Sequence, residues 1–161
     1  MKLDVLKQVI KELAAEFTEL REVHEIYLVP RITPLPSASP LELQVCEAGA
    51  EYIDHDGSAR REQFVLKVGI MQKVAFDSSN KSARALTDQT YSVFALKERV
   101  IDKLDNSFLP SGGDTLLVRP LIILKESEVE ESKDGNVNIK TLVFSGGLNA
   151  VWDPTSGKWV Q

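Results

Sequence analysis

The alternation of side chains between residues 64 and 71 constrains this fold more than any other feature of the chain. Apolar Phe64, Leu66, Val68 and Ile70 alternate with Val65, Lys67, Gly69 and Met71. Successive side chains of a strand point to opposite faces, so residues 61–74 are predicted to form a long strand with one strongly apolar face. We expect this strand at the centre of a sheet.

Two amphipathic helices are predicted before and after this strand. The first covers residues 3–21, and its apolar stripe is Leu3, Leu6, Ile10, Leu13, Phe17 and Leu20. The second covers residues 83–105 after the N-cap candidate Ser82, and its stripe is Leu86, Thr90, Val93, Phe94, Val100, Ile101 and Leu104. The first stripe also fits a coiled coil, but fewer than about three heptads favours packing on a sheet.

Further strands are expected at residues 25–32, 41–46, 115–124 and 136–144, and residues 50–54 fit either a strand or a loop. Pro30 and Pro120 each remove a ladder donor, which is typical of strand ends and edge strands. Short Asp-Gly turns at residues 56–57 and 134–135 favour hairpins. We therefore predict an α+β domain over residues 1–146, with a mainly antiparallel sheet carrying both helices on one face, followed by a tail at 147–161.

Composition limits the classes of partner. The chain has 161 residues, a formal charge of −5 and one cysteine, Cys46, which cannot form an intramolecular disulfide. No apolar run approaches the roughly 20 residues that cross a bilayer, and the N-terminal pattern is unlike a secretory signal, so we expect an intracellular origin. The acidic balance disfavours nucleic acid and favours protein partners.

No motif in the sequence indicates an enzyme. Asp54-His55-Asp56 offers three potential metal ligands, but adjacent residues of an exposed turn rarely converge on one ion. Cys46 has no basic neighbour in sequence to lower its pKa, so a structural thiol is expected. Gly157-Lys158 lacks the first glycine and the following helix of a phosphate loop. We expect no catalytic residue, cofactor or metal.

The order of the predicted elements is more informative than any motif. An N-terminal helix, a first strand ending near Arg31, a proline-rich loop, the strand at 41–45, the long strand at 64–74, a polar loop, a long helix and a terminal hairpin resemble phage tail-terminator, or tail-completion, proteins. The resemblance spans residues 1 to about 146. It implies a structural protein of the virion tail, assembled in the host cytoplasm as a hexameric ring.

That resemblance also implies partners. Such a ring caps the tail tube, stops tube polymerisation and contacts the neck or head connector, and in a contractile tail also the sheath. Projecting loops and the two tail tryptophans, which either fold back or anchor an interface, give the candidate interface Pro34, Pro36, His55, Arg60, Asp77, Lys81, Glu128, Glu130, Glu131, Trp152 and Trp159. The alternatives are a neck or head-completion protein and a small-ligand-binding α+β protein or enzyme.

Overall fold

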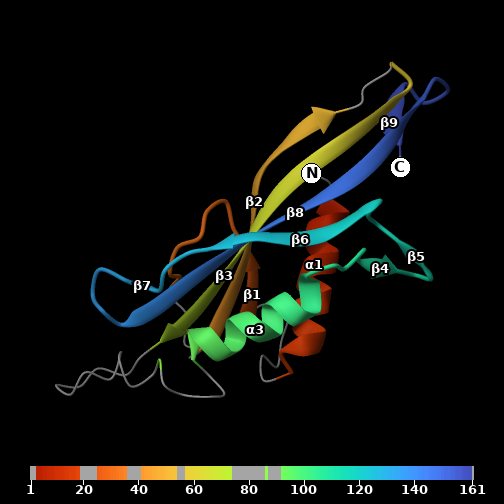
Figure 1. Ribbon diagram of the computed structural model, residues 1–161. Helices are drawn as coiled ribbons and strands as arrows, with labels where there is room; N and C mark the ends of the chain where they lie inside the picture. Colours follow the sequence, from red (N-terminus) through yellow and green to blue (C-terminus); the bar gives the residue numbers. More distant parts are fainter. Residues whose placement is uncertain are drawn as a thin grey trace.

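The computed structural model describes residues 3–18, 25–35, 41–53, 57–73, 86 and 92–160. Within them the fold is α+β, with one mixed seven-stranded sheet, a two-stranded sheet and two helices (Figure 1). The elements are α1 (Leu3–Glu16), β1 (Ile26–Leu28), β2 (Leu41–Ile53), β3 (Ala59–Lys73), α3 (Val93–Leu104), β4 (Pro110–Ser111), β5 (Asp114–Thr115), β6 (Arg119–Glu126), β7 (Glu130–Glu131), β8 (Val137–Asp153) and β9 (Lys158–Val160). The strand order is β1-β2-β3-β8-β6, and β7 and β9 also pair with β8.

The predicted central strand is confirmed. β3 lies third in the order and pairs antiparallel with β2 on one side and with β8 on the other. Its register with β8 is unbroken from Lys73–Val137 to Ala59–Val151, so the two strands form one long twisted ribbon (Figure 1). This ribbon positions the surfaces described below.

One hydrophobic cluster joins both helices to the sheet. It contains Val5, Leu6, Val9, Leu13 and Phe17 from α1 and its end, Val93, Leu96, Val100 and Leu104 from α3, and Phe64, Leu66, Val68 and Ile70 from β3. α1 contacts β1 and β2, whereas α3 contacts β3, β6 and β8. Leu3 and Phe94, predicted on the buried stripes, are instead 52% and 44% exposed.

The second helix begins later than predicted. α3 starts at Val93, because the Ser92 side chain caps it by accepting a hydrogen bond from the Ala95 N–H at 3.1 Å. Leu86 lies in a turn, and the N-cap candidate Ser82 lies outside the described residues. The first helix ends at Glu16, earlier than predicted, because Phe17 and Thr18 are described but are not helical. Residues 19–21 of its predicted range lie outside the described residues.

β1 pairs parallel to β2, so the chain must cross the sheet between them. It does so over the outer face, by which we mean the sheet face that carries Gln44, Lys67, Gly69 and Thr141. We call residues 29–35 the crossing segment. A Cβ built at Gly69 would lie 2.6 Å from Ile32 Cγ2, and the Thr33 N–H donates to Gln44 Oε1 at 3.0 Å. The prediction that the proline loop projects is therefore wrong for residues 33–35, although Pro34 itself is exposed.

The last strand is longer than predicted. β8 continues past Phe144 to Asp153, and β9 pairs back onto its end, so the described part of the glycine-rich tail extends the sheet. Gly146 lies within the strand rather than in a turn. A glycine is needed there because a Cβ would lie 2.8 Å from Phe64 Cζ. The boundary at residues 146–147 stays a prediction, and no break in β8 marks it.

β6 lies at the edge of the sheet, as its Pro120 predicts. Residues that follow α3 cover the outer backbone groups of this edge. The Asn106 N–H donates to the Leu121 carbonyl, the Leu121 N–H donates to the Ser107 carbonyl, and the Ile123 N–H donates to Asp105 Oδ1 at 2.9 Å. Covering an edge in this way blocks strand addition by another chain.

Candidate functional site

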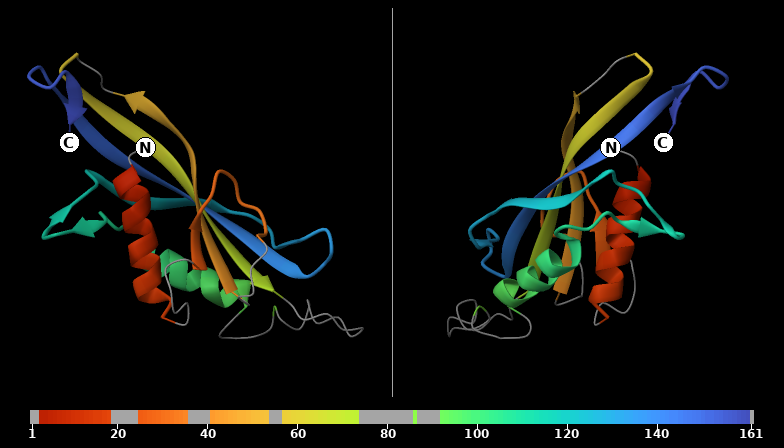
Figure 2. Two further views of the ribbon diagram at one scale, coloured as in Figure 1. Left: turned by 180° about the vertical axis from the view of Figure 1, so that it is seen from behind. Right: turned by 45° about the vertical axis from the view of Figure 1, so that its right-hand side comes forward.

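The most unusual part of the molecule is an arm at one end of the ribbon. We define the arm as residues 48–53, 57–62 and 149–160, which are the ends of β2, β3 and β8 together with β9. It extends beyond both helices (Figures 1 and 2). Of its described residues only Glu62 and Ala150 are buried, and none belongs to the core cluster. The arm is thus held mainly by strand pairing.

An arginine between aromatic rings marks one face of the arm. The Arg60 guanidinium carbon lies 4.8 Å from the centroid of the Tyr52 ring and 4.6 Å from that of Trp159. Trp152 packs edge-on against Trp159, with centroids 5.5 Å apart. We call Tyr52, Arg60, Trp152 and Trp159 the arm-tip cluster. Tyr52 is 55% exposed and Trp152 40% exposed, so the cluster is open to solvent.

Strand register explains why these side chains meet. Trp152 pairs directly with Trp159 across β8 and β9, and Arg60 pairs with Ala150, two positions before Trp152 on the same face. Cation–π contacts and aromatic pairs at exposed sites contribute about 0.5–1 kcal/mol and 0.5–1.5 kcal/mol respectively. Such contacts hold the cluster in shape without burying it.

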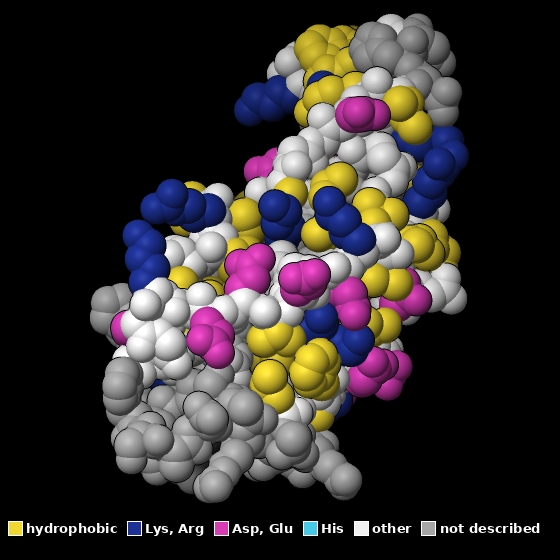
Figure 3. All heavy atoms as spheres, turned by 60° about the vertical axis from the view of Figure 1, so that its left-hand side comes forward, with side chains coloured by type: hydrophobic (Ala, Val, Ile, Leu, Met, Phe, Trp, Pro, Cys, Tyr) yellow, Lys and Arg dark blue, Asp and Glu magenta, His cyan; other side chains and the backbone are white. Residues whose placement is uncertain are grey.

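The opposite face of the arm is apolar as well. Val151 and Val160 face each other across β8 and β9 and are 53% and 41% exposed. In Figure 3, hydrophobic and Lys or Arg side chains lie together at the upper end of the molecule, where the arm projects. A projection with apolar side chains on both faces is typical of an interaction element.

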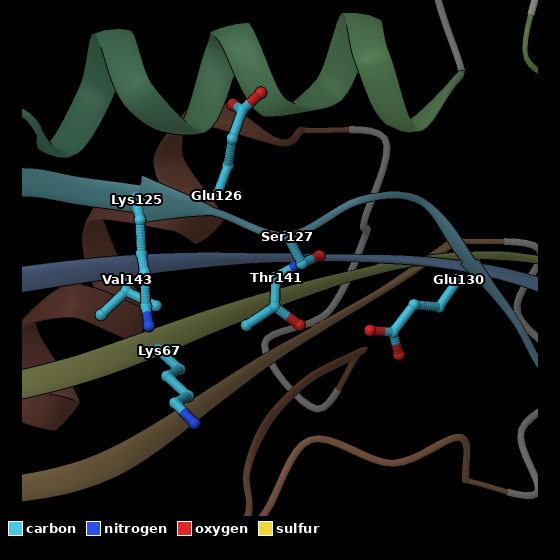
Figure 4. Close-up of a pocket in the computed structure, with 7 residues that line it drawn as sticks. All are labelled: Lys67, Lys125, Glu126, Ser127, Glu130, Thr141 and Val143. Carbon is cyan, nitrogen blue, oxygen red and sulfur yellow. The ribbon is translucent and has the colours of Figure 1, made fainter.

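Two adjoining hollows lie on the outer face of the sheet. One has a volume of about 350 Å³ and the other about 360 Å³, and both are lined by Lys67 and Thr141. The first also contains Lys125, Glu130 and Val143. Figure 4 shows Lys125 directed toward Val143 and the Glu130 carboxylate directed into the hollow.

Glu126 borders the first hollow but belongs to a different network. In Figure 4 its side chain points toward α3, where Lys97 Nζ donates to it at 2.9 Å. This hydrogen bond lowers the pKa of Glu126, and the buried Lys140 ammonium lies 3.5 Å away. Glu126 therefore takes part in the interactions of α3 rather than pointing into the hollow.

Three glutamates form an acidic end of the molecule, and one of them, Glu130, lines this hollow. Glu128, Glu130 and Glu131 are exposed, and Glu130 and Glu131 form β7, which pairs with β8 at Ile139 and Asn138. β8 therefore connects two candidate surfaces: the acidic end near its start and the arm-tip cluster at its end.

Buried polar groups on the outer face have a structural explanation. Gln44 Nε2 donates to Glu42 Oε2 at 2.8 Å, and Cys46 Sγ donates to the Pro30 carbonyl at 3.3 Å. Burial raises the pKa of the Glu42 carboxyl and of the Cys46 thiol. These groups attach the crossing segment to the sheet, and the raised pKa of Cys46 makes it a poor nucleophile.

The structure brings some of the predicted interface residues together and separates others. Arg60, Trp152 and Trp159 meet in the arm-tip cluster, the three glutamates share the acidic end, and Pro34 lies on the crossing segment. Pro36, His55, Asp77 and Lys81 lie outside the described residues.

Sequence reasoning missed Tyr52, Lys67 and Thr141. Tyr52 could have been found from its place at the end of an alternating strand, and Lys67 from its charge within an apolar one. Thr141 gives no comparable signal.

Among the described residues, no group of three or more His, Cys, Asp or Glu side chains could hold a metal ion. Nor does the described part of the chain contain a helix that is long and apolar enough to cross a membrane. Neither a protein-family model nor a curated protein matches the chain.

Proposed function

We propose that this chain is a virion structural protein that caps a phage tail tube as a hexameric ring. In this role it stops tube polymerisation and joins the tail to the neck or head connector. The proposed protomer is an α+β unit with a mainly antiparallel sheet and both helices on one face. Its antiparallel registers and its single core cluster support that description.

The arm is the observation that carries the proposal. Aromatic and apolar side chains that project from the core are enriched at interfaces. A large exposed apolar surface favours association with another protein over the monomeric state. A ring also needs two different surfaces per subunit, because each copy contacts its neighbours through opposite sides. The arm and the acidic end are two such surfaces on one chain.

The order of elements supports a tail terminator over other ring-forming proteins. The N-terminal helix, the crossing segment, the long central strand, the second helix and the terminal hairpin follow in the order that the resemblance describes. A neck or head-completion protein of the same virion is the alternative, and ring size and the binding partner distinguish it from a tail terminator.

Light scattering after size exclusion, combined with electron microscopy of purified tail tubes, tests the proposal. We expect either a hexamer in solution or a ring that forms on tube ends, and we expect tubes to stop growing when the protein is added during tube assembly. Bovine serum albumin at equal mass concentration controls for nonspecific coating. Tubes that lengthen normally, with bare ends, would overturn the proposed function.

A further inference from the structure

We propose that the outer face of the sheet binds a small organic anion, whose charged group lies on Lys67 and whose apolar part lies against Val143. Lys67 and Thr141 line both hollows on this face, so the two hollows meet at these side chains. The site goes beyond the proposed tail-capping role and does not depend on it.

Strand pairing places Lys67 in the floor of this site. Lys67 pairs directly with Cys46 of β2 and with Val143 of β8. Directly opposed residues of antiparallel strands share a face of the sheet, so these side chains form one row across the outer face. The crossing segment lines the hollow on one side through residues 30–32, and residues 125–127 line the hollow on the other side. Lys67 therefore lies between two walls.

The cations that line the hollows are unpaired. Arg31, Lys67 and Lys125 form no hydrogen bond or ion pair within the described part of the chain. Arg31 and Lys125 are exposed, whereas Lys67 is half-buried. A half-buried ammonium has lost part of its hydration, so an anion that accepts its hydrogen bonds is favoured. Lys67 is the residue that defines the site.

Three carboxylates also line the hollows, but two of them are already engaged. Glu126 accepts a hydrogen bond from Lys97 at 2.9 Å, and Glu47 has an interaction partner of its own. Glu130 forms no ion pair with a described residue, and its carboxylate points into the hollow (Figure 4). The unpaired groups are thus three cations and one carboxylate, and their sum favours an anionic ligand.

The rest of the lining suits an organic ligand rather than a bare ion. The Thr141 hydroxyl is a further donor for an anionic oxygen, and Val143 and Ile32 supply apolar surface. The hollows, of about 350 and 360 Å³, are at the lower end of the roughly 300–1,000 Å³ of small-molecule sites. A phosphate or carboxylate group on Lys67 with a small apolar body along Val143 matches this lining.

Phenyl phosphate has both features and is the first probe, titrated into nitrogen-labelled protein and followed by NMR. We expect the backbone amide signals of Lys67, Gly69 and Thr141 to shift while those of the arm stay in place. Inorganic phosphate lacks the apolar body and should bind at least about threefold more weakly. Benzoate carries a carboxylate on the same ring, and the ratio of its Kd to that of phenyl phosphate distinguishes the two charged groups.

Two variants of the hollow should change the affinity in opposite directions. Lys67→Met removes the ammonium and should weaken phenyl phosphate binding by at least about tenfold. Glu130→Gln removes the opposing charge and should strengthen binding by about twofold. Lys133→Met is the matched control, because Lys133 is exposed and lines neither hollow, and it should bind like the wild type.

Several results would overturn the site. One is a wild type whose Kd for phenyl phosphate exceeds about 10 mM, and another is signal shifts spread over the lysines of the helices. An equal loss of affinity in Lys133→Met and Lys67→Met would show a general effect of charge. Tighter binding of a glutamate oligomer than of phenyl phosphate would assign the face to an acidic segment of a protein instead. Circular dichroism checks folding, and if Lys67→Met does not fold, a Glu130→Gln variant without increased affinity overturns the site.

Discussion

The body and the arm are built from the same strands but are stabilised differently. In the body, Phe64, Leu66 and Val68 of β3 are completely buried in the cluster that both helices complete. Two residues before Phe64, at Glu62, β3 enters the arm, where only Glu62 and Ala150 are buried. The difference shows that hydrogen bonds between strands are enough to extend the sheet, whereas burial of its side chains requires helices packed on it. The arm therefore exposes more of its surface than the body and buries less of it.

Truncating one aromatic in each region should give the largest difference. Phe64→Ala removes a completely buried ring and should lower the free energy of unfolding by about 3–5 kcal/mol. Trp152→Ala removes a ring that is 40% exposed and should cost less than about 1.5 kcal/mol. Urea denaturation followed by far-UV circular dichroism measures both. Similar decreases in the free energy of unfolding for the two variants would contradict the different stabilisation of body and arm.

The glycine pair where the arm begins should give a smaller contrast. Gly146→Ala places a methyl group 2.8 Å from Phe64 Cζ and 3.1 Å from Leu121 Cδ2, both completely buried, and should cost about 1–3 kcal/mol. Gly147→Ala instead places a methyl group 3.1 Å from Cβ of the exposed Arg119, a less close contact than the 2.8 Å to Phe64 Cζ. Thermal unfolding followed by circular dichroism should give a lower Tm for Gly146→Ala than for Gly147→Ala. A lower Tm for Gly147→Ala would contradict the close packing of Gly146 against Phe64.

The arm should also unfold at a lower urea concentration than the body when its aromatic contacts are weakened. Both tryptophans of the protein lie in the arm, so tryptophan fluorescence reports on that region alone. Arg60→Met removes two cation–π contacts and should destabilise the arm by about 0.5–1 kcal/mol. The fluorescence transition in urea should shift to lower concentration while the circular dichroism transition stays in place. Lys158→Met is the control, and an equal shift of both signals would show that arm and body unfold as one unit.

The smallest effect should come from a carboxyl under the crossing segment. Burial raises the folded-state pKa of Glu42, so its contribution to stability is fully present below the unfolded value of about 4.3 and is lost as pH rises through the folded pKa. Glu42→Gln stays neutral at every pH and should be more stable than the wild type at pH 7, with the gain disappearing below pH 4. Urea midpoints across this range measure it. Glu51→Gln, in the exposed part of β2, is the matched control.

Local sequence patterns predicted the strands with regular side-chain alternation. They did not predict features that depend on contacts between residues far apart in the sequence. The central position of β3 and the edge position of β6 follow from unbroken alternation and from Pro120. The extent of β8 does not, because Gly146 acquires its role from the distant Phe64 in the folded chain. The start of α3 was missed although its cap is local, because Ser82 and Ser92 are equally good N-cap residues by type. Glycine pairs predict turns, but here Gly146 allows close approach of a ring.

The candidate site divides in the same way. Sequence alone singled out Trp152 and Trp159, because large aromatics in a polar tail are costly to leave exposed, and Arg60, because it lies beside a predicted hairpin tip. It did not place them together, and it omitted Tyr52. Register across β2, β3, β8 and β9 decides which side chains share a face, and register depends on bulges such as the one between Glu47 and Ala50.

The sequence by itself determined that this chain forms helices and a sheet around a strand with one apolar face, because side-chain periodicity is a local property that each segment carries with it. Only the tertiary structure decided that β1 pairs parallel, that the crossing segment covers the outer face, and that β3 and β8 continue into an uncovered arm. These features depend on which distant segments meet, and burial selects among pairings that local pattern leaves equivalent.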